Sequence, residues 1–392
     1  MQVYADNAAT APISERALSE MIKYYSMEYQ NPSSLHTYGQ AAADALTDAR
    51  ERIAKCLNCD ERGIIFTSGG SEADNQAIIS AARLGAKKNK KHIISTAIEH
   101  HAVLHTLEAL EKQGFSVTLL PVSKEGLITA EQVREAITDE TCLVTVMFAN
   151  NEIGTIQPIS EIGAVCREKK VLFHTDAVQA VGHVNVNINE MNIDMLSLAA
   201  HKFHGPKGAG VLYAKRGIFL EPLIAGGAQE RGKRAGTENL PAIMGMAAAL
   251  EDAVAHLSEY KERVSALRDK VIAELSKIPY SFLNGPTGDK RLPNNVNMCF
   301  EGIEGEGLLL MLDMFGIAAS SGSACTSGSL DPSHVLLAIG LPHEIAHGSL
   351  RLSFSELTTE EEADYIIEKV PGVVERLRQM SPVWEKMMKE NA

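Results

Sequence analysis

The sequence predicts an α/β fold in which a mostly parallel sheet is covered by helices on both faces. Seven short apolar segments lie between residues 64 and 213, and amphipathic segments of helical period separate the first five of them. Strands that alternate with helices are joined by crossover connections, which place neighbouring strands parallel and bury both faces of the sheet. After about residue 280 the pattern changes to shorter, mixed elements. This change predicts a second, smaller α+β part.

The ends of the expected strands locate the candidate site. They are Ile64–Phe66, His92–Ser95, Val117–Leu120, Leu143–Phe148, Val171–Phe173, Met195–Leu198 and Gly210–Tyr213. The helices expected between the first five strands are Ser71–Lys87, His101–Lys112, Thr129–Ile137 and Ile159–Glu168. A helix is also expected before the first strand, because Ala41, Ala45, Ala49, Ile53 and Leu57 recur every four residues.

The C-terminal part begins with a long helical stretch from Leu240 to about Ile278, which we expect to be kinked or broken. It is followed by the elements Val296–Phe300 (strand), Glu306–Phe315 (helix), His334–Ile339 (helix) and Leu350–Phe354 (strand). Thr358-Thr-Glu-Glu361 has the spacing of a capping box and predicts the start of the last helix.

Composition and charge restrict the class of protein. The chain has 392 residues, 45% of them hydrophobic, and a formal net charge of −13, which argues against nonspecific affinity for nucleic acid or anionic membranes. The N-terminus has neither the basic nor the apolar region of a signal peptide. Six scattered cysteines fit a reducing cytoplasm, and Cys56-Leu-Asn-Cys59 without a second pair predicts a helix-end pair with no metal or redox role.

The most specific chemistry lies in two residues that follow apolar segments. Lys202 stands in a glycine-rich turn after the segment that starts at Met195, and Asp176 ends the segment that starts at Val171. Pyridoxal phosphate enzymes use this pair, with the lysine as Schiff-base amine and the carboxylate against the pyridinium nitrogen. The alternative is a buried Lys–Asp ion pair beside an ordinary glycine turn.

Further polar groups are predicted at the same edge of the sheet. Asn150, Asn151 and the turn Thr67-Ser-Gly-Gly-Ser71 also follow strand ends, where ligands of parallel sheets bind. The glycines of that turn allow backbone amides to face a phosphate at a helix N-terminus, although a simple N-cap has the same pattern. His101 and His105 are spaced as a metal-binding face, but without a third ligand we expect no metal site.

Two residues of the C-terminal part are further candidates. Cys325 lies in a run of small residues, Ala318–Leu330, that is typical of a mobile loop and suits an exposed nucleophile better than a structural cysteine. Arg351 can pair bidentately with a substrate carboxylate, and the alternative is a surface salt bridge from a strand.

Seven collinear stretches resemble motifs of the NifS/IscS-like cysteine desulfurases, a branch of the class V aminotransferase group. They span essentially the whole chain. The stretches are Tyr4–Pro12, Thr67–Asn75, Ile98–Val103, Asn150–Gly154, His201–Gly208, Arg234–Asn239 and Ser320–Cys325.

The resemblance implies a fold-type I pyridoxal phosphate transferase that converts L-cysteine to L-alanine and carries the sulfur as a persulfide on Cys325. It implies a large cofactor-binding domain of residues 15–255, with a mostly parallel seven-stranded sheet, and a smaller α+β domain of residues 1–14 and 256–392. In this assignment Lys202 holds the cofactor and moves the Cα proton, and Asp176 faces the ring nitrogen. The remaining assignments are a phosphate site at Gly70, Ser71 and His201, ring stacking and acid/base chemistry at His100, the phenolic oxygen at Gln179, and the substrate carboxylate at Asn151 and Arg351.

The resemblance also predicts partners. Thr237 matches a phosphate ligand that reaches the site from the neighbouring subunit, which implies a homodimer. A protein acceptor of the sulfur is expected, either an iron–sulfur scaffold or a thiolation enzyme, with no direct nucleic acid or membrane partner. One departure is Ala199, where the family often has a serine whose hydroxyl contacts the phosphate.

Other functions stay open at this point. A selenocysteine lyase or an aminotransferase of the same group would share the cofactor site, although an aminotransferase has no use for a cysteine in a mobile loop. A sulfur-relay scaffold without catalysis is a further alternative, against which the intact Lys202, Asp176 and Cys325 argue.

Overall fold

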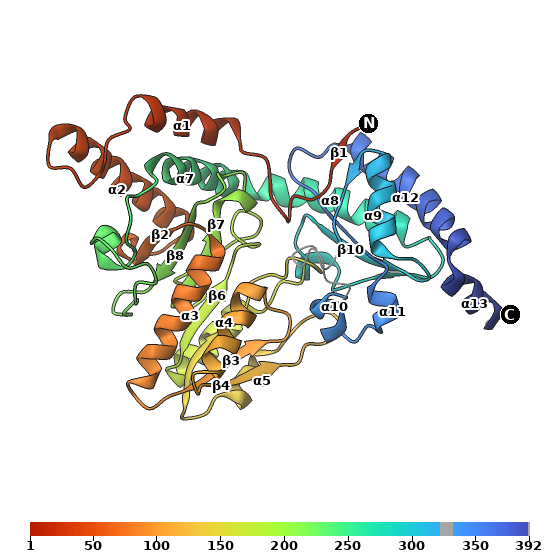
Figure 1. Cartoon of the computed structure of the whole chain (residues 1–392), viewed down its shortest axis with the longest axis horizontal. Helices are drawn as coiled ribbons and strands as arrows, with labels where there is room; N and C mark the ends of the chain where they lie inside the picture. The colour runs from red at the N-terminus through yellow and green to blue at the C-terminus, as the bar shows by residue number, and fades with distance from the viewer. Residues whose placement is uncertain (322–331, 391–392) are drawn as a thin grey trace.

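A seven-stranded sheet forms the centre of the larger part of the molecule (Figure 1). The computed structural model describes residues 1–321 and 332–390. The sheet order is β2 (Ile64–Thr67), β8 (Gly210–Ala214), β7 (Met195–Ala199), β6 (Leu172–Asp176), β5 (Thr141–Thr145), β3 (His92–Thr96) and β4 (Ser116–Leu120). Only β8 runs antiparallel to its neighbours in this sheet, β2 and β7. The predicted mostly parallel seven-stranded α/β fold is therefore confirmed.

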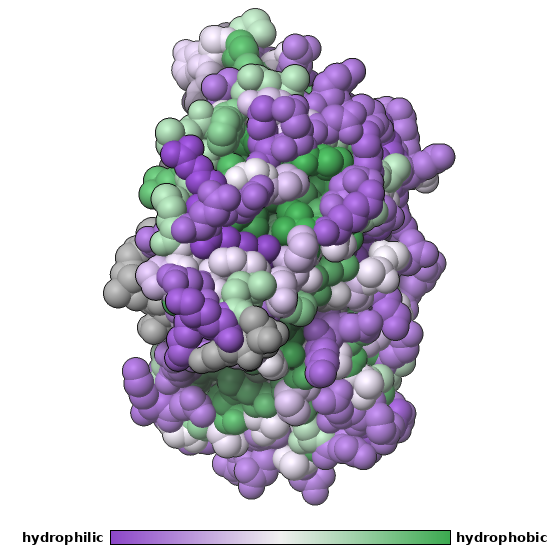
Figure 2. Space-filling view, turned by 90° about the vertical axis from the view of Figure 1, so that its right-hand side faces the viewer, coloured by the Kyte–Doolittle hydropathy of each residue, from purple (hydrophilic) through white to green (hydrophobic). Residues whose placement is uncertain are grey.

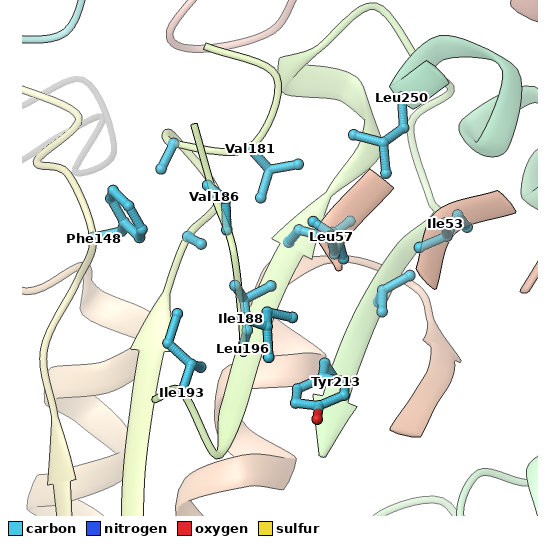
Figure 3. Packing of buried hydrophobic residues seen from close by; sticks show 14 of the residues in the cluster. Ile53, Leu57, Phe148, Val181, Val186, Ile188, Ile193, Leu196, Tyr213 and Leu250 are labelled. Carbon is cyan, nitrogen blue, oxygen red and sulfur yellow. The ribbon is translucent and has the colours of Figure 1, made fainter. Parts of the chain in front are cut away.

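Helices pack on both faces of this sheet because its strands are apolar on both sides. Successive residues of β2 show this: Ile64 and Phe66 join one buried cluster, while Ile65 joins the other. The first cluster includes α2 (Thr37–Leu57), α6 (Ile159–Lys169) and α7 (Leu240–Ala255), and Figure 3 shows Leu57 of α2 packed near Ile188 and Leu196. The second cluster includes α3 (Gly70–Ala86) and α4 (His101–Glu111).

The remaining elements of the larger part are short or peripheral. They are α1 (Glu15–Ser26), α5 (Ala130–Ala136) and the 3₁₀ turns η1 (Glu61–Gly63), η2 (Ala200–Lys202) and η3 (Gln229–Gly232). The prediction for α2 was partly wrong: Ala49, Ile53 and Leu57 are buried, but Ala41 is exposed and the buried face continues through Ala42. A strict four-residue spacing drifts by about 40° per step around a helix of 3.6 residues per turn, so the stripe has left the core at Ala41, about four turns from Leu57.

The smaller part is an α+β unit with its own core. Its strands β9 (Ser281–Leu283), β10 (Asn295–Phe300) and β12 (Ser349–Ser353) are antiparallel, and β1 (Val3–Tyr4) pairs in parallel with β11 (Ile317–Ala318). Val3 and Ala5 belong to the same buried cluster as residues of the C-terminal part. The other elements are α8 (Leu257–Leu275), α9 (Gly305–Met314), α10 (His334–Ala338), α11 (His343–Ala346), α12 (Glu360–Met380), α13 (Pro382–Glu390) and η4 (Gly288–Lys290). The division at residues 15 and 256 stays a prediction.

The start of the last long helix differs from the prediction by one residue. The capping box of α12 is formed by Thr359 and Glu362, and Thr358 instead donates its backbone N–H to the carbonyl oxygen of Ser355. Two threonines in succession offer two registers, and the turn that Thr358 closes with Ser355 leaves Thr359 as the N-cap.

The predicted break in the long helical stretch lies at His256, where α7 ends and α8 begins at an angle of 73°. No single helix among the described residues is long and apolar enough to span a membrane; only this bent pair passes when its two helices are taken together. Viewed from the end that carries α12 and α13, mostly hydrophilic residues cover the surface, with hydrophobic ones in small areas between them (Figure 2).

Candidate active site

A cavity of about 300 Å³ opens where β5, β6 and β7 end and α3 begins. It brings together every predicted site residue of the described chain except Thr237. The lining residues are Ala8, Ala9, Gly70, Ser71, Asp74, His100, Met147, Ala149, Asn151, Asp176, Val178, Gln179, Ala199, His201, Lys202 and Arg351. Parallel strands that end at one edge of a sheet produce this convergence.

Lys202 is held in the 3₁₀ turn that follows β7. Its Nζ donates hydrogen bonds to the carbonyl oxygens of Ala8 and Ala9, at 2.6 and 2.8 Å. These carbonyls belong to the N-terminal segment, so residues almost 200 positions apart in the chain fix the amine over the cavity. Nδ1 of the neighbouring His201 lies 3.2 Å from the hydroxyl oxygen of Thr10. Burial, with the positive charge of Lys202, lowers the pKa of His201 to about 4, so its ring is neutral.

Asp176 is the last residue of β6 and is buried. Its Oδ1 accepts a hydrogen bond from the backbone N–H of Val178 at 3.0 Å. Burial raises the pKa of Asp176, while His100, this hydrogen bond and Lys202 act in the opposite direction. An acidic group of this kind prefers to ionise against a cation, and a protonated ring nitrogen is such a cation.

The N-terminus of α3 forms an anion-binding cradle. Gly69 has φ 155° and ψ −176°, a conformation that favours glycine. A Cβ on Gly70 would lie 2.6 Å from Cγ2 of Val178, so a side chain there would collide with the wall of the cavity. Ser71 adds a hydroxyl in the first turn, where the free backbone N–H groups and the helix dipole favour a phosphate.

His100 is the N-cap of α4 and faces the cavity. Its Nδ1 accepts a hydrogen bond from the backbone N–H of Ala102 at 3.1 Å. A ring nitrogen that accepts from an N–H carries no proton, so in the neutral form of His100 the proton is on Nε2. Nε2 is therefore the ring nitrogen of His100 that can exchange a proton.

Arg351 reaches the cavity from β12 of the smaller part and is 2% exposed. Its guanidinium pairs with Asp6 at 3.0 Å and donates to the carbonyl oxygen of Asn151 at 3.2 Å. Its Nε is buried and has no hydrogen-bond partner among the described residues. The surface salt bridge considered as the alternative is thereby excluded. Gln179 is held by a hydrogen bond from its Nε2 to the carbonyl oxygen of Ala8, at 2.9 Å.

Thr237 does not line this cavity and is exposed. The motif that contains it is anchored to α3, because Arg234 pairs with Glu72 at 2.9 Å. Cys325 lies outside the described residues. The five other cysteines are free thiols, and burial raises the pKa of each, to about 11 or about 12. Each of these five thiols is therefore protonated at neutral pH, which makes it a poor nucleophile.

Sequence reasoning missed a polar layer under the cavity. It consists of Asp74 on α3, His174 on β6 and Ser197 on β7, all of them buried. The signal was present: His174 precedes Asp176 by two residues and so shares its face of the strand, and Asp74 lies on the same face of α3 as Ile78 and Ala81. No group of three or more potential metal ligands occurs in the described part of the chain.

The donor set fits a phosphorylated pyridine aldehyde. The helix N-terminus could receive a dianion, Lys202 could supply the amine for the aldehyde, and Asp176 could place a buried carboxyl group against a ring nitrogen. Arg351 lines the same cavity and could bind a substrate carboxylate there.

Comparison with known proteins identifies the family of this chain. Residues 3–366 match the family model described as aminotransferase class-V. The chain is 55% identical to the cysteine desulfurase IscS of Clostridium botulinum (strain Hall) over 390 residues, which cover 99% of this chain and 98% of that protein.

Two solved structures are similar over most of their length. A NifS-like protein superposes with a TM-score of 0.90 at 38% identity, covering 96% of this chain and 100% of the other. SspA in complex with cysteine superposes with a TM-score of 0.80 at 38% identity, covering 91% and 100%. This chain belongs to the class-V aminotransferase family, in its cysteine desulfurase branch.

Proposed function

We propose that the chain is a pyridoxal phosphate-dependent cysteine desulfurase that converts L-cysteine to L-alanine and carries the sulfur as a persulfide on Cys325. Lys202 and Asp176 in one cavity with the cradle of α3 are the observation that carries this proposal. The family to which the chain belongs uses this cofactor.

We assign roles in this cavity to the site residues that the sequence predicted. Gly70, Ser71 and His201 would hold the phosphate, Gln179 the phenolic oxygen and Asp176 the ring nitrogen. Bound there, the cofactor supplies an electron sink for the electron pair released at the substrate Cα. Lys202 would hold the cofactor covalently until the substrate amine replaces it, and its free amine would then accept the Cα proton.

The substrate would be oriented by its carboxylate. Arg351 offers its guanidinium, and Asn151 lines the same cavity. Nε2 of His100 is the candidate group that exchanges a proton with the substrate.

Sulfur transfer is assigned to Cys325. The described chain before its segment ends at Ser321, and Ser320 pairs with Arg351 through backbone hydrogen bonds of 2.6 and 3.1 Å. The thiolate of Cys325 would attack the substrate sulfur, and the new S–S bond would form as the C–S bond breaks. The carbon keeps the electron pair and takes up a proton, which gives alanine.

The proposal includes a homodimer that completes each site with Thr237 of the neighbouring subunit. Leu18, Ile22 and Tyr25 form one stripe on α1 and are 45%, 54% and 61% exposed, which supports an interface there. A protein acceptor in iron–sulfur assembly or tRNA thiolation, in the cytoplasm, would then receive the sulfur.

The test is cysteine-dependent sulfur transfer in the purified enzyme. With an added thiol reductant, which reduces the persulfide and releases its outer sulfur, L-cysteine should give alanine and sulfide in equal amounts. Without the reductant, mass spectrometry should find one added sulfur on the peptide that contains Cys325. Cys325→Ser should keep the visible absorption of the bound cofactor and lose sulfide formation by at least about 100-fold, because a hydroxyl is neutral at this pH. Cys59→Ser is the matched control. Near wild-type desulfuration by Cys325→Ser would favour the lyase or aminotransferase alternative.

A further inference from the structure

Asp74 is a second buried carboxyl group at the base of the cofactor cavity. It lies on α3, one turn after the cradle, and is 1% exposed. It lines the same cavity as Asp176. The function proposed above gives it no role.

The surroundings of Asp74 offer no compensating cation. Its buried Oδ1 has no hydrogen-bond partner among the described residues. The nearest basic atom, Nε2 of His174, lies 3.6 Å from Oδ1. That ring is held between Ser197 Oγ at 3.0 Å and Thr145 Oγ1 at 2.8 Å, and burial lowers its pKa to about 3, so it is neutral.

The other groups that face Asp74 are acidic or neutral. From β6 comes Asp176, from β7 the hydroxyl of Ser197, and from the loop before α4 the buried Glu99. Glu99 accepts from the Thr96 hydroxyl at 2.6 Å and from the backbone N–H of Met147. Burial, and then the charge of Asp176, raise the pKa of Asp74.

Asp176 has the better environment for a negative charge. It accepts the N–H of Val178, and His100 and Lys202 both favour its ionised form. When two carboxyl groups share a dry site, the first proton stays on the less compensated group.

We propose that Asp74 is a positioning residue that stays protonated at neutral pH, so that the Asp74–Asp176 pair presents one negative charge to the cofactor ring nitrogen. The proposal rests on the cofactor assigned above. With one negative charge opposite the ring, Asp176 is the carboxylate that accepts the hydrogen bond from the protonated ring nitrogen. A second ionised carboxylate would place a like charge beside Asp176 in the same buried site, which is unfavourable.

The direct test is infrared spectroscopy of the resting holoenzyme at neutral pH. The difference spectrum between wild type and Asp74→Asn should contain the C=O stretch of one protonated carboxyl group, which the variant lacks. Glu99→Gln is the matched control and should remove its own band while the Asp74 band remains. A difference spectrum that instead shows loss of an ionised carboxylate overturns the proposal.

The cofactor provides a second readout. Asp74→Asn should keep the wavelength of the visible band, whereas Asp176→Asn should shift or lose it. Asp74→Ala should weaken cofactor binding, and the conservative asparagine variant should restore it. If Asp74→Asn shifts the band as Asp176→Asn does, Asp74 is ionised and the proposal is wrong.

Stability against pH separates protonation from packing. An acid whose folded pKa is raised loses stability as pH rises from its unfolded pKa of about 4 toward its folded value. The melting temperature of holoenzyme Asp74→Asn, minus that of wild type, should therefore increase from about pH 5 to about pH 8. A constant difference contradicts the proposal. These readouts need no substrate, so an enzyme that binds the cofactor but releases no sulfide overturns only the proposed function.

Discussion

The hydroxyl of Ser333 donates a hydrogen bond to the carboxyl group of Glu152, across 181 residues of sequence. Glu152 follows Asn151 at the edge of the cavity and is 6% exposed, while Ser333 is the N-cap of α10. The same hydroxyl accepts the backbone N–H groups of Val335 and Leu336. This contact therefore fixes the point where the chain returns from the Cys325 segment.

Glu152 should make stability depend on pH. Burial raises its pKa to about 7, against the opposing effects of Ser333 and Arg351. The unfolded carboxyl has a pKa of about 4.3, so the folded protein loses about 1.4 kcal/mol per pH unit through this group as pH rises between these two values. Glu152→Gln keeps an acceptor for Ser333 without the charge. Its melting temperature relative to wild type should rise from pH 4.5 to 7 and then level off. A difference that stays flat across this window contradicts the assignment.

Lys202→Ala should abolish the covalent link to the cofactor and lower turnover by at least about 100-fold. The hydrogen bonds to Ala8 and Ala9 are lost as well, but both carbonyls lie at the cavity and can bind water. We expect the far-ultraviolet circular dichroism to be unchanged. Borohydride reduction followed by peptide mapping is the measurement. A reduced cofactor still attached to the variant chain would assign the amine elsewhere.

Ala199→Ser should strengthen cofactor binding. Ala199 lines the cavity beside the cradle, and a serine would add one hydroxyl donor. A hydrogen bond of about 0.5–1.5 kcal/mol predicts a dissociation constant lower by roughly 2- to 10-fold. Equilibrium dialysis against the cofactor measures it, with the melting temperature as a control for folding. Weaker binding would mean that the cavity has no room for the added oxygen.

Complementation tests the proposed sharing of sites between two subunits. Lys202→Ala and Thr237→Ala chains that carry different affinity tags are mixed, and the heterodimer is purified through both tags. It should have one site with both changes and one site with neither. Its activity should approach half that of wild type, above either parent. Activity no higher than the mean of the two parents would place Thr237 in its own subunit's site.

Most of the fold was predictable because each buried strand is visible in the sequence as a short apolar run. The apolar runs Ile64–Phe66 and Met195–Leu198 can be buried only on two faces, and helical segments stand between the runs. The edge where Asp176 and Lys202 meet follows from strand direction alone.

The residues that the sequence could not assign depend on distant packing. Nothing near Arg351 in the chain indicates Asp6 as its partner, because β1 and β12 meet only after the smaller part folds. The role of Asp74 could not be predicted for the same reason, because it depends on His174 and Ser197, which come from two other elements. Such side chains are visible as polar residues on apolar faces, but their partners are not.

The Asp6–Arg351 pair has a consequence for synthesis of the protein. A ribosome that has released the first 300 residues has already supplied Lys202, Asp176 and the cradle of α3, and also Asp6. The arginine that pairs with Asp6 comes only with β12, later in translation. A nascent chain of this length therefore has Lys202, Asp176 and the cradle but not Arg351, so the proposed substrate site is completed only when Asp6 and Arg351 have met.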